Sequence, residues 1–212
     1  MKKIISLSLF ILLVVSSCSS NTPKGIFAKS SLAEDKLFEY AEKNFEKKHY
    51  ELAVENYNEF LDSYPASVRA SEAELKIAEA QFLNEDYLEA QYAYEKFIKS
   101  YPWNTNIPHA RYQLALCALN QYKDVRRDQA PLLSALKKFQ DVVDKHPSTE
   151  YAEKSSLEIA KCRTMLAEYE LSVAKFYIKQ GKRPAAEHRL NFLITQYPET
   201  PAAETAANML GT

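Results

Sequence analysis

Residues 50–65, with the sequence YELAVENYNEFLDSYP, recur three more times along the chain in modified form. Each copy ends at a proline, and similar residues precede that proline at fixed distances. Alanine stands twelve residues before the proline, a large apolar residue eight before it, and two apolar residues five and four before it. The four prolines are Pro65, Pro102, Pro147 and Pro198.

This spacing predicts an amphipathic helix that ends at the proline. In the quoted copy, Tyr57, Phe60, Leu61 and Tyr64 follow Ala53 by 4, 7, 8 and 11 residues, which places all five on one helical face. Proline then ends the helix, because it lacks an amide donor and restricts the residue before it. Repetition of one such unit predicts an all-α solenoid of stacked helical hairpins.

Composition supports a helical protein and excludes some functions. The 212 residues include only three glycines, and 46% are hydrophobic. Scarce glycine in a chain rich in Ala, Glu, Lys and Leu favours helices with short connections. Without Lys2 and Lys3 the chain has 25 basic and 28 acidic residues, so no basic face for nucleic acid is expected.

The first 17 residues read as a signal peptide, with Lys2 and Lys3 followed by an apolar run over residues 4–15. As a helix this run covers about 18 Å, short of the roughly 30 Å hydrocarbon core of a membrane. Residues 15–18, VSSC, resemble a bacterial lipobox, which implies cleavage before Cys18 and a covalent lipid on its thiol. With Ser19 next, the resemblance favours the outer membrane. An ordinary secretory signal is the alternative.

The chain after the signal divides into a tether over residues 18–32 and a helical array over residues 33–212. The third unit contains eight extra residues around 122–130, which we expect to form a surface loop before Pro131 begins a helix. A long uninterrupted helix is expected over 149–180, and residues 200–212 provide only a terminal half unit.

The period near 34 residues, with alanine, aromatic and proline at fixed positions, resembles the tetratricopeptide repeat (TPR). Several features together resemble the BamD family of TPR lipoproteins in the outer-membrane β-barrel assembly machinery. These are the lipobox, the Tyr-Pro unit ends, the RRDQ loop at 126–129, the long penultimate first helix, and the segments 78–82, 87–90 and 169–177. The family has a complete fifth repeat, whereas this chain has half of one.

The resemblance implies a non-enzymatic lipoprotein without a cofactor, on the periplasmic face of the outer membrane. It would scaffold the barrel-forming subunit through that subunit's periplasmic domains, contact accessory lipoproteins, and bind unfolded outer membrane proteins for folding and insertion. Another periplasmic TPR scaffold, for cell-wall or division complexes, is the alternative. A wall hydrolase would need a catalytic domain, and no remaining segment is long enough for one.

First helices of TPR arrays line a concave face that can hold an extended peptide. Three of the aromatic candidates, Phe38, Phe45 and Phe82, could equally belong to the core. Aromatics beside acidic residues would suit the aromatic-ended strands of outer-membrane barrels. The expected groove residues are Phe38, Glu42, Phe45, Glu79, Phe82, His109, Tyr112 and Leu116.

The family likeness places a contact with the barrel-forming subunit on the inserted loop and the long helix. Mixed charges on a protruding loop suit electrostatic docking, although the loop could also be a simple solvated connection. The expected partner-binding residues are Arg126, Arg127, Asp128, Tyr169 and Tyr177.

Cysteine and histidine provide no sign of catalysis or metal binding. Cys117 and Cys162 each lie fifteen residues after a unit-ending proline, so they occupy equivalent places on neighbouring first helices, about 8–10 Å apart. A disulfide needs Cα atoms closer than about 7 Å, so we expect two buried free thiols. No histidine has a second histidine or a cysteine at i+3 or i+4, and no nucleophile elbow or phosphate-binding glycine loop is present.

Overall fold

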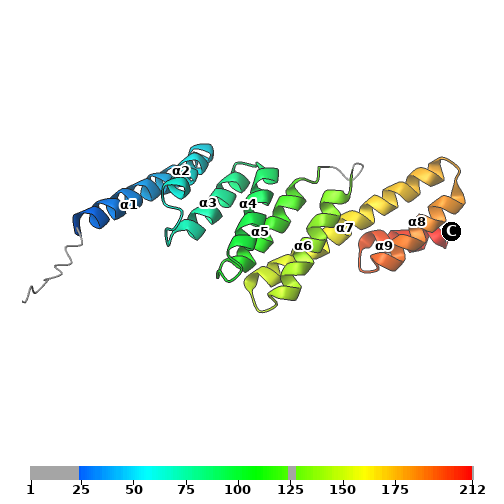
Figure 1. Ribbon diagram of the computed structural model, residues 1–212. Coiled ribbons are helices and arrows are strands. Elements are labelled where there is room, and N and C mark those ends of the chain that lie inside the picture. The colour runs from blue at the N-terminus through cyan, green and yellow to red at the C-terminus, as the bar shows by residue number, and fades with distance from the viewer. Residues whose placement is uncertain (1–23, 124–127, 212) are drawn as a thin grey trace, which may run out of the picture.

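The structure, a computed structural model, describes residues 24–123 and 128–211, and this part of the chain is helical throughout. Consecutive helices form four antiparallel hairpins that stack in chain order into an elongated array (Figure 1). The predicted TPR-like solenoid is therefore confirmed. The hairpins are α1 (Lys24–Glu46) with α2 (Tyr50–Ser63), α3 (Ala70–Leu83) with α4 (Tyr87–Ser100), α5 (Ile107–Asn120) with α6 (Ala130–Lys145), and α7 (Glu150–Lys179) with α8 (Arg183–Gln196), followed by α9 (Pro201–Leu210).

The recurrent residues form the core, as their spacing predicted. The alanine near the start of each second helix has an exposed fraction of 1% or less, and the large residue four positions later is also buried. Alanine permits the close approach of two helices, while the larger neighbours fill the space around it. These pairs are Ala53 and Tyr57, Ala90 and Tyr94, Ala135 and Phe139, and Ala186 and Leu190.

The proline that ends each second helix lies in a tight turn with the same hydrogen bond in all four units. The carbonyl of the residue before proline accepts the amide of the residue three positions later, at 3.0–3.1 Å. The donors and acceptors are Ser67 to Tyr64, Asn104 to Tyr101, Thr149 to His146, and Thr200 to Tyr197. Because α3, α5, α7 and α9 each start within a few residues of such a turn, the four turns lie along one border of the array, which we call the proline edge (Figure 1).

On the opposite border of the array, three of the hairpins contain a residue with a left-handed backbone conformation between their two helices. Lys48, Glu85 and Gly181 have φ values of 60°, 64° and 69°. In each case the next residue donates its amide back to the last turn of the first helix, which satisfies a carbonyl left free there. Only the third of these positions is glycine, the residue that adopts this conformation without strain.

The helix α7 is 30 residues long, against 14 for α2 to α5, and it joins two separate parts of the core. Cys162 and Leu166 pack with α5 and α6, whereas Leu171 and Ala174 pack with α8 and α9. Thr149 caps its N-terminus by accepting the amide of Ala152. The half unit α9 covers α8 through three buried alanines, as expected of a terminal helix.

The first helix begins earlier than expected. We expected helices from residue 33, but α1 starts at Lys24, inside the stretch read as a tether. That stretch lacks apolar periodicity, yet it contains no proline after Pro23 that would prevent a helix from continuing. Among the described helices, none combines the length and the apolar character needed to cross a membrane.

Candidate functional site

A connected row of side chains crosses the first helices from α1 to α7. The ammonium group of Lys76 lies 4.4 Å from the centre of the Phe45 ring and 3.1 Å from Glu79 Oε2. Glu79 Oε1 lies 3.8 Å from His109 Nδ1, and the His109 ring stacks on Tyr151 at 5.4 Å. The row joins four helices that are far apart in sequence, and we call the surface that carries it the first-helix face.

Further groups extend this row on α5 and α7. The Tyr112 ring lies 5.9 Å from Tyr151, and the ammonium group of Lys154 lies 5.0 Å from the Tyr151 ring. Gln113 Nε2 is 3.1 Å from His109 Nε2, so the amide donates to the ring nitrogen. The face therefore alternates aromatic rings with charged and amide groups.

Two adjacent units contain the same tyrosine–glutamate pair beneath this face. The Tyr57 hydroxyl donates to Glu42, and Tyr94 and Glu79 occupy the equivalent positions one unit later. There Glu79 pairs with Lys76 instead, and the fully buried Tyr94 hydroxyl has no hydrogen-bond partner among the described residues. Burial raises the pKa of Tyr94, and the nearby Glu79 carboxylate raises it further.

His109 is held in its neutral form at pH 7. Burial lowers the pKa of its imidazole, and the approach of Glu79 offsets this only in part. The neutral His109 ring lies between the Gln113 amide, the Glu79 carboxylate and the Tyr151 ring. In this form it can hydrogen-bond to a bound chain without adding a charge. The buried Oε1 of Gln113 has no partner in the described chain.

The structure corrects one expected groove residue. Phe38 is fully buried between α1 and α2, with ring contacts of 5.6 Å to Tyr57 and 5.0 Å to Phe60, so it belongs to the core. Its position on α1 faces the hairpin partner, which sequence periodicity alone did not distinguish from the neighbouring face.

The remaining expected groove residues divide into two groups. Phe45, Glu79, His109 and Tyr112 are partly exposed and make the first-helix contacts described above. Glu42 is also partly exposed, but it accepts from Tyr57 on α2. Phe82 and Leu116 are also partly exposed, but they mainly support packing. Phe82 contacts Tyr87 at 5.4 Å, where the α3–α4 hairpin closes, and Leu116 packs against the core of α5, α6 and α7.

Sequence reasoning missed three members of the row, Lys76, Tyr151 and Lys154. Lys76 stands three residues before Glu79, a helical spacing that predicts an ion pair. Tyr151 lies in the long helix that was predicted over residues 149–180. Its contact with α5 depends on how α7 crosses that helix, which no local pattern specifies.

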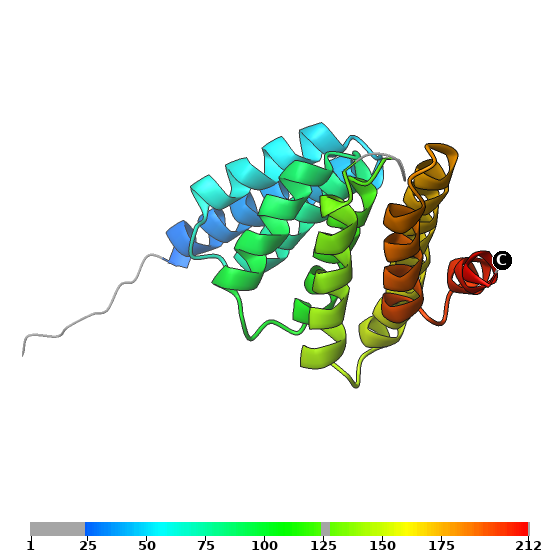
Figure 2. The ribbon, with the colours of Figure 1, turned by 90° about the vertical axis from the view of Figure 1, so that its right-hand side faces the viewer.

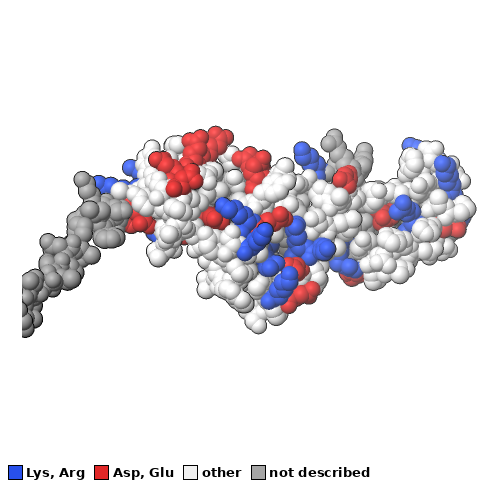
Figure 3. Space-filling model, in the orientation of Figure 1, with Lys and Arg blue, Asp and Glu red and all other residues white. Residues whose placement is uncertain are grey.

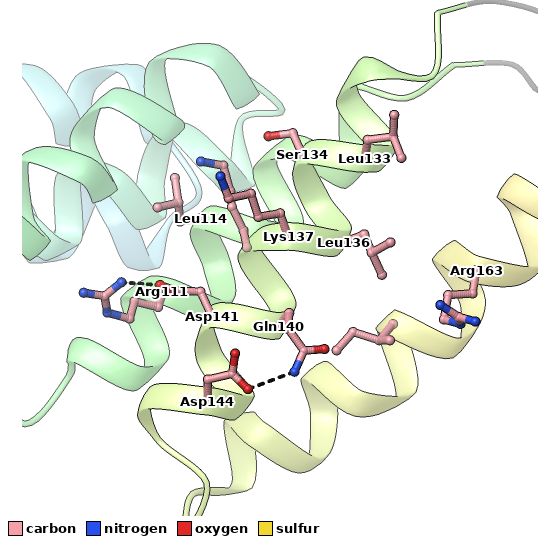
Figure 4. Close-up of a pocket in the computed structure, with 12 residues that line it drawn as sticks. Arg111, Leu114, Leu133, Ser134, Leu136, Lys137, Gln140, Asp141, Asp144 and Arg163 are labelled. Carbon is pink, nitrogen blue, oxygen red and sulfur yellow. Dashed lines mark hydrogen bonds and ion pairs between the residues drawn. The ribbon is translucent and has the colours of Figure 1, made fainter. Parts of the chain in front are cut away.

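An open groove of about 860 Å³ lies on the other side of the array, where α6 projects between α5 and α7 (Figure 4). Leu133, Leu136 and Ile159 provide its apolar floor. Charged groups surround it, including the ion pair between Arg111 and Asp141 at 2.6 Å. On the face shown in Figure 3, basic side chains gather over these middle helices, whereas acidic ones gather over the N-terminal units.

A second cavity of about 470 Å³ continues from the first and shares Leu133 with it. Asp128, Tyr169 and Phe192 are among its lining residues. Leu133 and Phe192 are 50% and 40% exposed, so this region offers apolar area to a partner. We call the two cavities together the second-helix groove, because the second helix α6 provides the largest share of its lining residues, followed by α7.

The length of α7 accounts for this groove. α6 packs on the N-terminal half of α7, whereas α8 packs on the C-terminal half. The two second helices are therefore offset along α7, and Figure 2 shows α6 and α8 as separate ridges. In the first units a 14-residue α3 contacts both α2 and α4 over the same turns.

Two of the five expected partner-binding residues meet in this groove. Asp128 also accepts the Ala130 amide at 2.9 Å and so caps α6, while Tyr169 lines the wall formed by α7. Tyr177 lies two turns further along α7, is partly exposed, and does not line the groove. Arg126 and Arg127 lie outside the described residues.

The two described cysteines are free and buried, as predicted. Burial raises the pKa of the Cys117 thiol to about 12 and that of Cys162 to about 11, so both are protonated at pH 7. Within the described chain, no three His, Cys, Asp or Glu side chains gather in a way that could hold a metal ion.

Comparison with known proteins agrees with the resemblance seen in the sequence. A protein from Rickettsia prowazekii (strain Madrid E), named outer membrane protein assembly factor BamD, is 30% identical over 155 residues, which cover 73% of this chain and 62% of that protein. A protein of the same name from Neisseria meningitidis serogroup B is 25% identical over 222 residues, covering 99% and 83%. A third, from Caulobacter vibrioides, is 36% identical over 97 residues, covering 46% and 32%.

Among solved structures, a thermophilic TPR protein from Thermus thermophilus superposes with a TM-score of 0.45 and 16% identity, over 84% of this chain and all of that one. This score is too low to establish a shared overall shape, so the TPR character rests on the hairpins described above. The family model described as YfiO, outer membrane lipoprotein, matches residues 31–211. The chain therefore belongs to the YfiO (BamD) family of outer membrane lipoproteins, a family of non-enzymatic assembly factors.

Proposed function

We propose that this protein is a lipid-anchored scaffold of the β-barrel assembly machinery, attached through Cys18 to the periplasmic face of the outer membrane. It holds unfolded outer membrane proteins on the first-helix face and docks the barrel-forming subunit on the second-helix groove. The scaffold orients chains for folding and insertion and carries out no covalent chemistry.

The row of side chains on the first-helix face is the observation that carries substrate binding. An extended chain must satisfy its backbone amides while it is held, and the face offers carboxylate and amide acceptors on successive helices. The rings of Phe45, Tyr112 and Tyr151 lie between these groups and can receive aromatic side chains. Weak contacts spread over four helices suit many different unfolded sequences.

The experiment on this face replaces Glu79 and His109 together by alanine. Both are partly exposed, so their loss disconnects the row with little effect on the core. We expect at least about tenfold weaker binding of a peptide from the C-terminal strand of a barrel, equivalent to about 1.4 kcal/mol, measured by fluorescence anisotropy.

A matched control replaces Glu95 on α4 and His188 on α8, which are exposed on second helices, and should leave the affinity unchanged. Equal affinities of the two double variants, both with normal helicity, would contradict substrate binding on the first-helix face.

The second-helix groove has the character of a protein interface. It combines exposed apolar side chains with surrounding charges of both signs, which set the orientation of a partner and its rate of association. The partner-binding residues Arg126, Arg127, Asp128, Tyr169 and Tyr177 were expected from the same half of the chain. We place the periplasmic domains of the barrel-forming subunit there.

The experiment on the groove replaces Leu133 and Phe192 by serine. Since both side chains are about half exposed, the double variant should keep its fold but bind the periplasmic domains of the barrel-forming subunit at least about tenfold more weakly in biolayer interferometry. Leu88 and Tyr92 on α4, 50% and 65% exposed, provide the matched control pair. Loss of binding in the control alone would place the subunit on the N-terminal units instead.

A further inference from the structure

Trp103 is the only tryptophan in the chain, and it is 95% exposed. Tryptophan buries more apolar area than other side chains when it packs, and it is highly buried on average. Here it contributes almost nothing to the core of the described chain. Packing within the described chain therefore does not explain why a tryptophan stands at this position.

The turn that carries Trp103 is rigid. Pro102 and Trp103 occupy its two central positions, and Asn104 donates its amide to the Tyr101 carbonyl at 3.0 Å. The Asn104 side chain in turn accepts the Asn106 amide at 2.9 Å, immediately before α5 begins. The indole is thus presented on a fixed support.

The same turn occurs four times along the proline edge, so its tip residues can be compared directly. The residues that follow the four prolines are Ala66, Trp103, Ser148 and Glu199. All are exposed, and only the second is large and apolar. Turn geometry consequently does not require tryptophan at this place. Val68, in the first turn, is 97% exposed and adds a second apolar group to the edge.

The proline edge is also the edge to which the membrane anchor leads. α1 starts on this side of the array, ahead of the level at which α3 begins (Figure 1). The 37-residue spacing of the first two units aligns Ala70, the first residue of α3, with residue 33. Residues 24–32 of α1 therefore extend beyond the edge by about 14 Å, at 1.5 Å per residue.

Cys18 is six residues before Lys24, and six residues of chain reach about 20 Å at most. A lipid on Cys18 would thus hold the nearest part of the proline edge within about 34 Å of the membrane, and closer when α1 tilts. Indole has an apolar body and an N–H donor, a combination that favours the boundary between lipid headgroups and acyl chains.

We propose that the proline edge faces the outer membrane and that Trp103 inserts into its lipid interface, as a second attachment point beside the lipid on Cys18. The inference rests on the proposed lipidation and does not depend on either protein-binding surface. Several acyl chains on one cysteine hold a protein stably at a membrane but do not set its orientation, and an interfacial side chain would fix the orientation of the anchored array.

Because Trp103 is the only tryptophan, its fluorescence reports directly on this contact. The lipidated full-length protein is incorporated into vesicles of phosphatidylethanolamine and phosphatidylglycerol, with and without brominated acyl chains. We expect blue-shifted emission, protection from acrylamide, and quenching by the brominated lipid. The unlipidated protein with Trp103→Ser should bind these vesicles about tenfold more weakly than the unlipidated parent, as expected for withdrawal of one large apolar side chain from an interface.

A matched control moves the reporter to the middle of α4, as Trp103→Ser with Tyr92→Trp. Tyr92 is exposed but distant from the turn, so this tryptophan should remain accessible to acrylamide and unquenched by lipid.

Flotation of the vesicles reports whether the lipid anchor attaches the protein to the membrane, independently of the tryptophan fluorescence. Protein that floats while Trp103 stays in water would overturn the proposal and leave the anchor intact, and protein that fails to float would overturn both. A blue shift that appears only after the barrel-forming subunit is added would assign Trp103 to a protein partner and also overturn it.

Discussion

The first two hairpins and the last two use the same core and differ in the surface they build. In α1–α4, helices of regular length stack so that α2 and α4 meet the same turns of α3. In α5–α8, the inserted loop and the 30-residue α7 offset α6 from α8. The irregular half thus presents a groove beside α6.

This difference shows how a repeat protein acquires a new surface without a new core. The alanine and large apolar positions are buried in all four units, so the hairpins remain intact. Lengthening one first helix offsets the two second helices that pack on it. The first-helix face still continues from α1 to α7, because Tyr151 near the start of α7 stacks on His109.

The largest expected effect concerns whether neighbouring packing clusters of the array are separate in stability. Phe97 is fully buried in the cluster that contains Cys117, whereas Cys162 belongs to the next cluster. Phe97→Ala should lower the free energy of unfolding by about 3–5 kcal/mol, measured by urea denaturation. In a Cys18→Ser background, Cys117 should then react with a thiol reagent much faster than Cys162, because units of a solenoid open locally.

Equal acceleration of the two thiols would show that the two clusters unfold as one body. Tyr92→Ala, at a position 65% exposed on the same helix, provides the control and should change stability by less than about 0.5 kcal/mol.

A smaller effect tests how α8 is held on α7 in the irregular half. Arg189 Nη1 lies 3.0 Å from Glu170, whose side chain is 10% exposed, whereas Arg183 and Glu187 form a pair at the surface. Arg189→Ala should cost about 1.5–3 kcal/mol, because it leaves a buried carboxylate without its partner. Arg183→Ala should cost about 0–0.5 kcal/mol in the same denaturation experiment. Similar losses of stability for the two substitutions would mean that the Arg189–Glu170 pair is as well hydrated as the Arg183–Glu187 pair.

The hairpin turns permit a comparison of single residues between the halves. Lys48 and Gly181 both have positive φ, and a Cβ at Gly181 would meet no atom within 4 Å. Lys48→Gly should therefore raise the free energy of unfolding by up to about 1 kcal/mol, and Gly181→Ala should lower it by about the same amount. If both substitutions shifted stability in the same direction, backbone strain would not be the cause.

The smallest effect is the pH dependence of the first-helix face. Since burial lowers the pKa of His109, the unfolded chain binds its proton more readily, and the contribution of this residue to stability decreases as pH falls below about 6.5. Glu79 and Glu150 oppose this shift, and Lys76 and Lys154 strengthen it. The stability difference between the parent and His109→Gln should narrow from pH 7.5 to 5.5. A difference that widens would mean that the charged pair with Glu79 dominates.

The fold followed from the sequence because it depends on local periods. The offsets from Ala53 to Tyr64 predicted the buried face, and the prolines predicted the ends of the second helices. The greater length of α7 was also predicted, from a run of residues without proline or glycine. The expected start at residue 33 was wrong, since absence of periodicity does not end a helix and α1 starts at Lys24.

The surfaces were less predictable, because they depend on how helices cross. Phe38 and Phe45 have the same character and lie seven residues apart on α1, yet one is fully buried and the other contacts Lys76 on the next first helix. Asp128 and Tyr169 were chosen from one half of the chain, but their meeting in one cavity follows from the offset of α6 and α8. Contacts between hairpins involve side-chain packing that single-helix patterns do not contain.

Site-specific photo-crosslinking in cells tests the two-surface account most directly. A photoreactive residue is placed at Gln113 on the first-helix face or at Leu133 in the second-helix groove, with Leu88 as the control on α4. We predict that position 113 captures unfolded outer membrane proteins, that position 133 captures the barrel-forming subunit, and that position 88 captures neither. Capture of the barrel-forming subunit from position 113, or of substrates from position 133, would contradict the account.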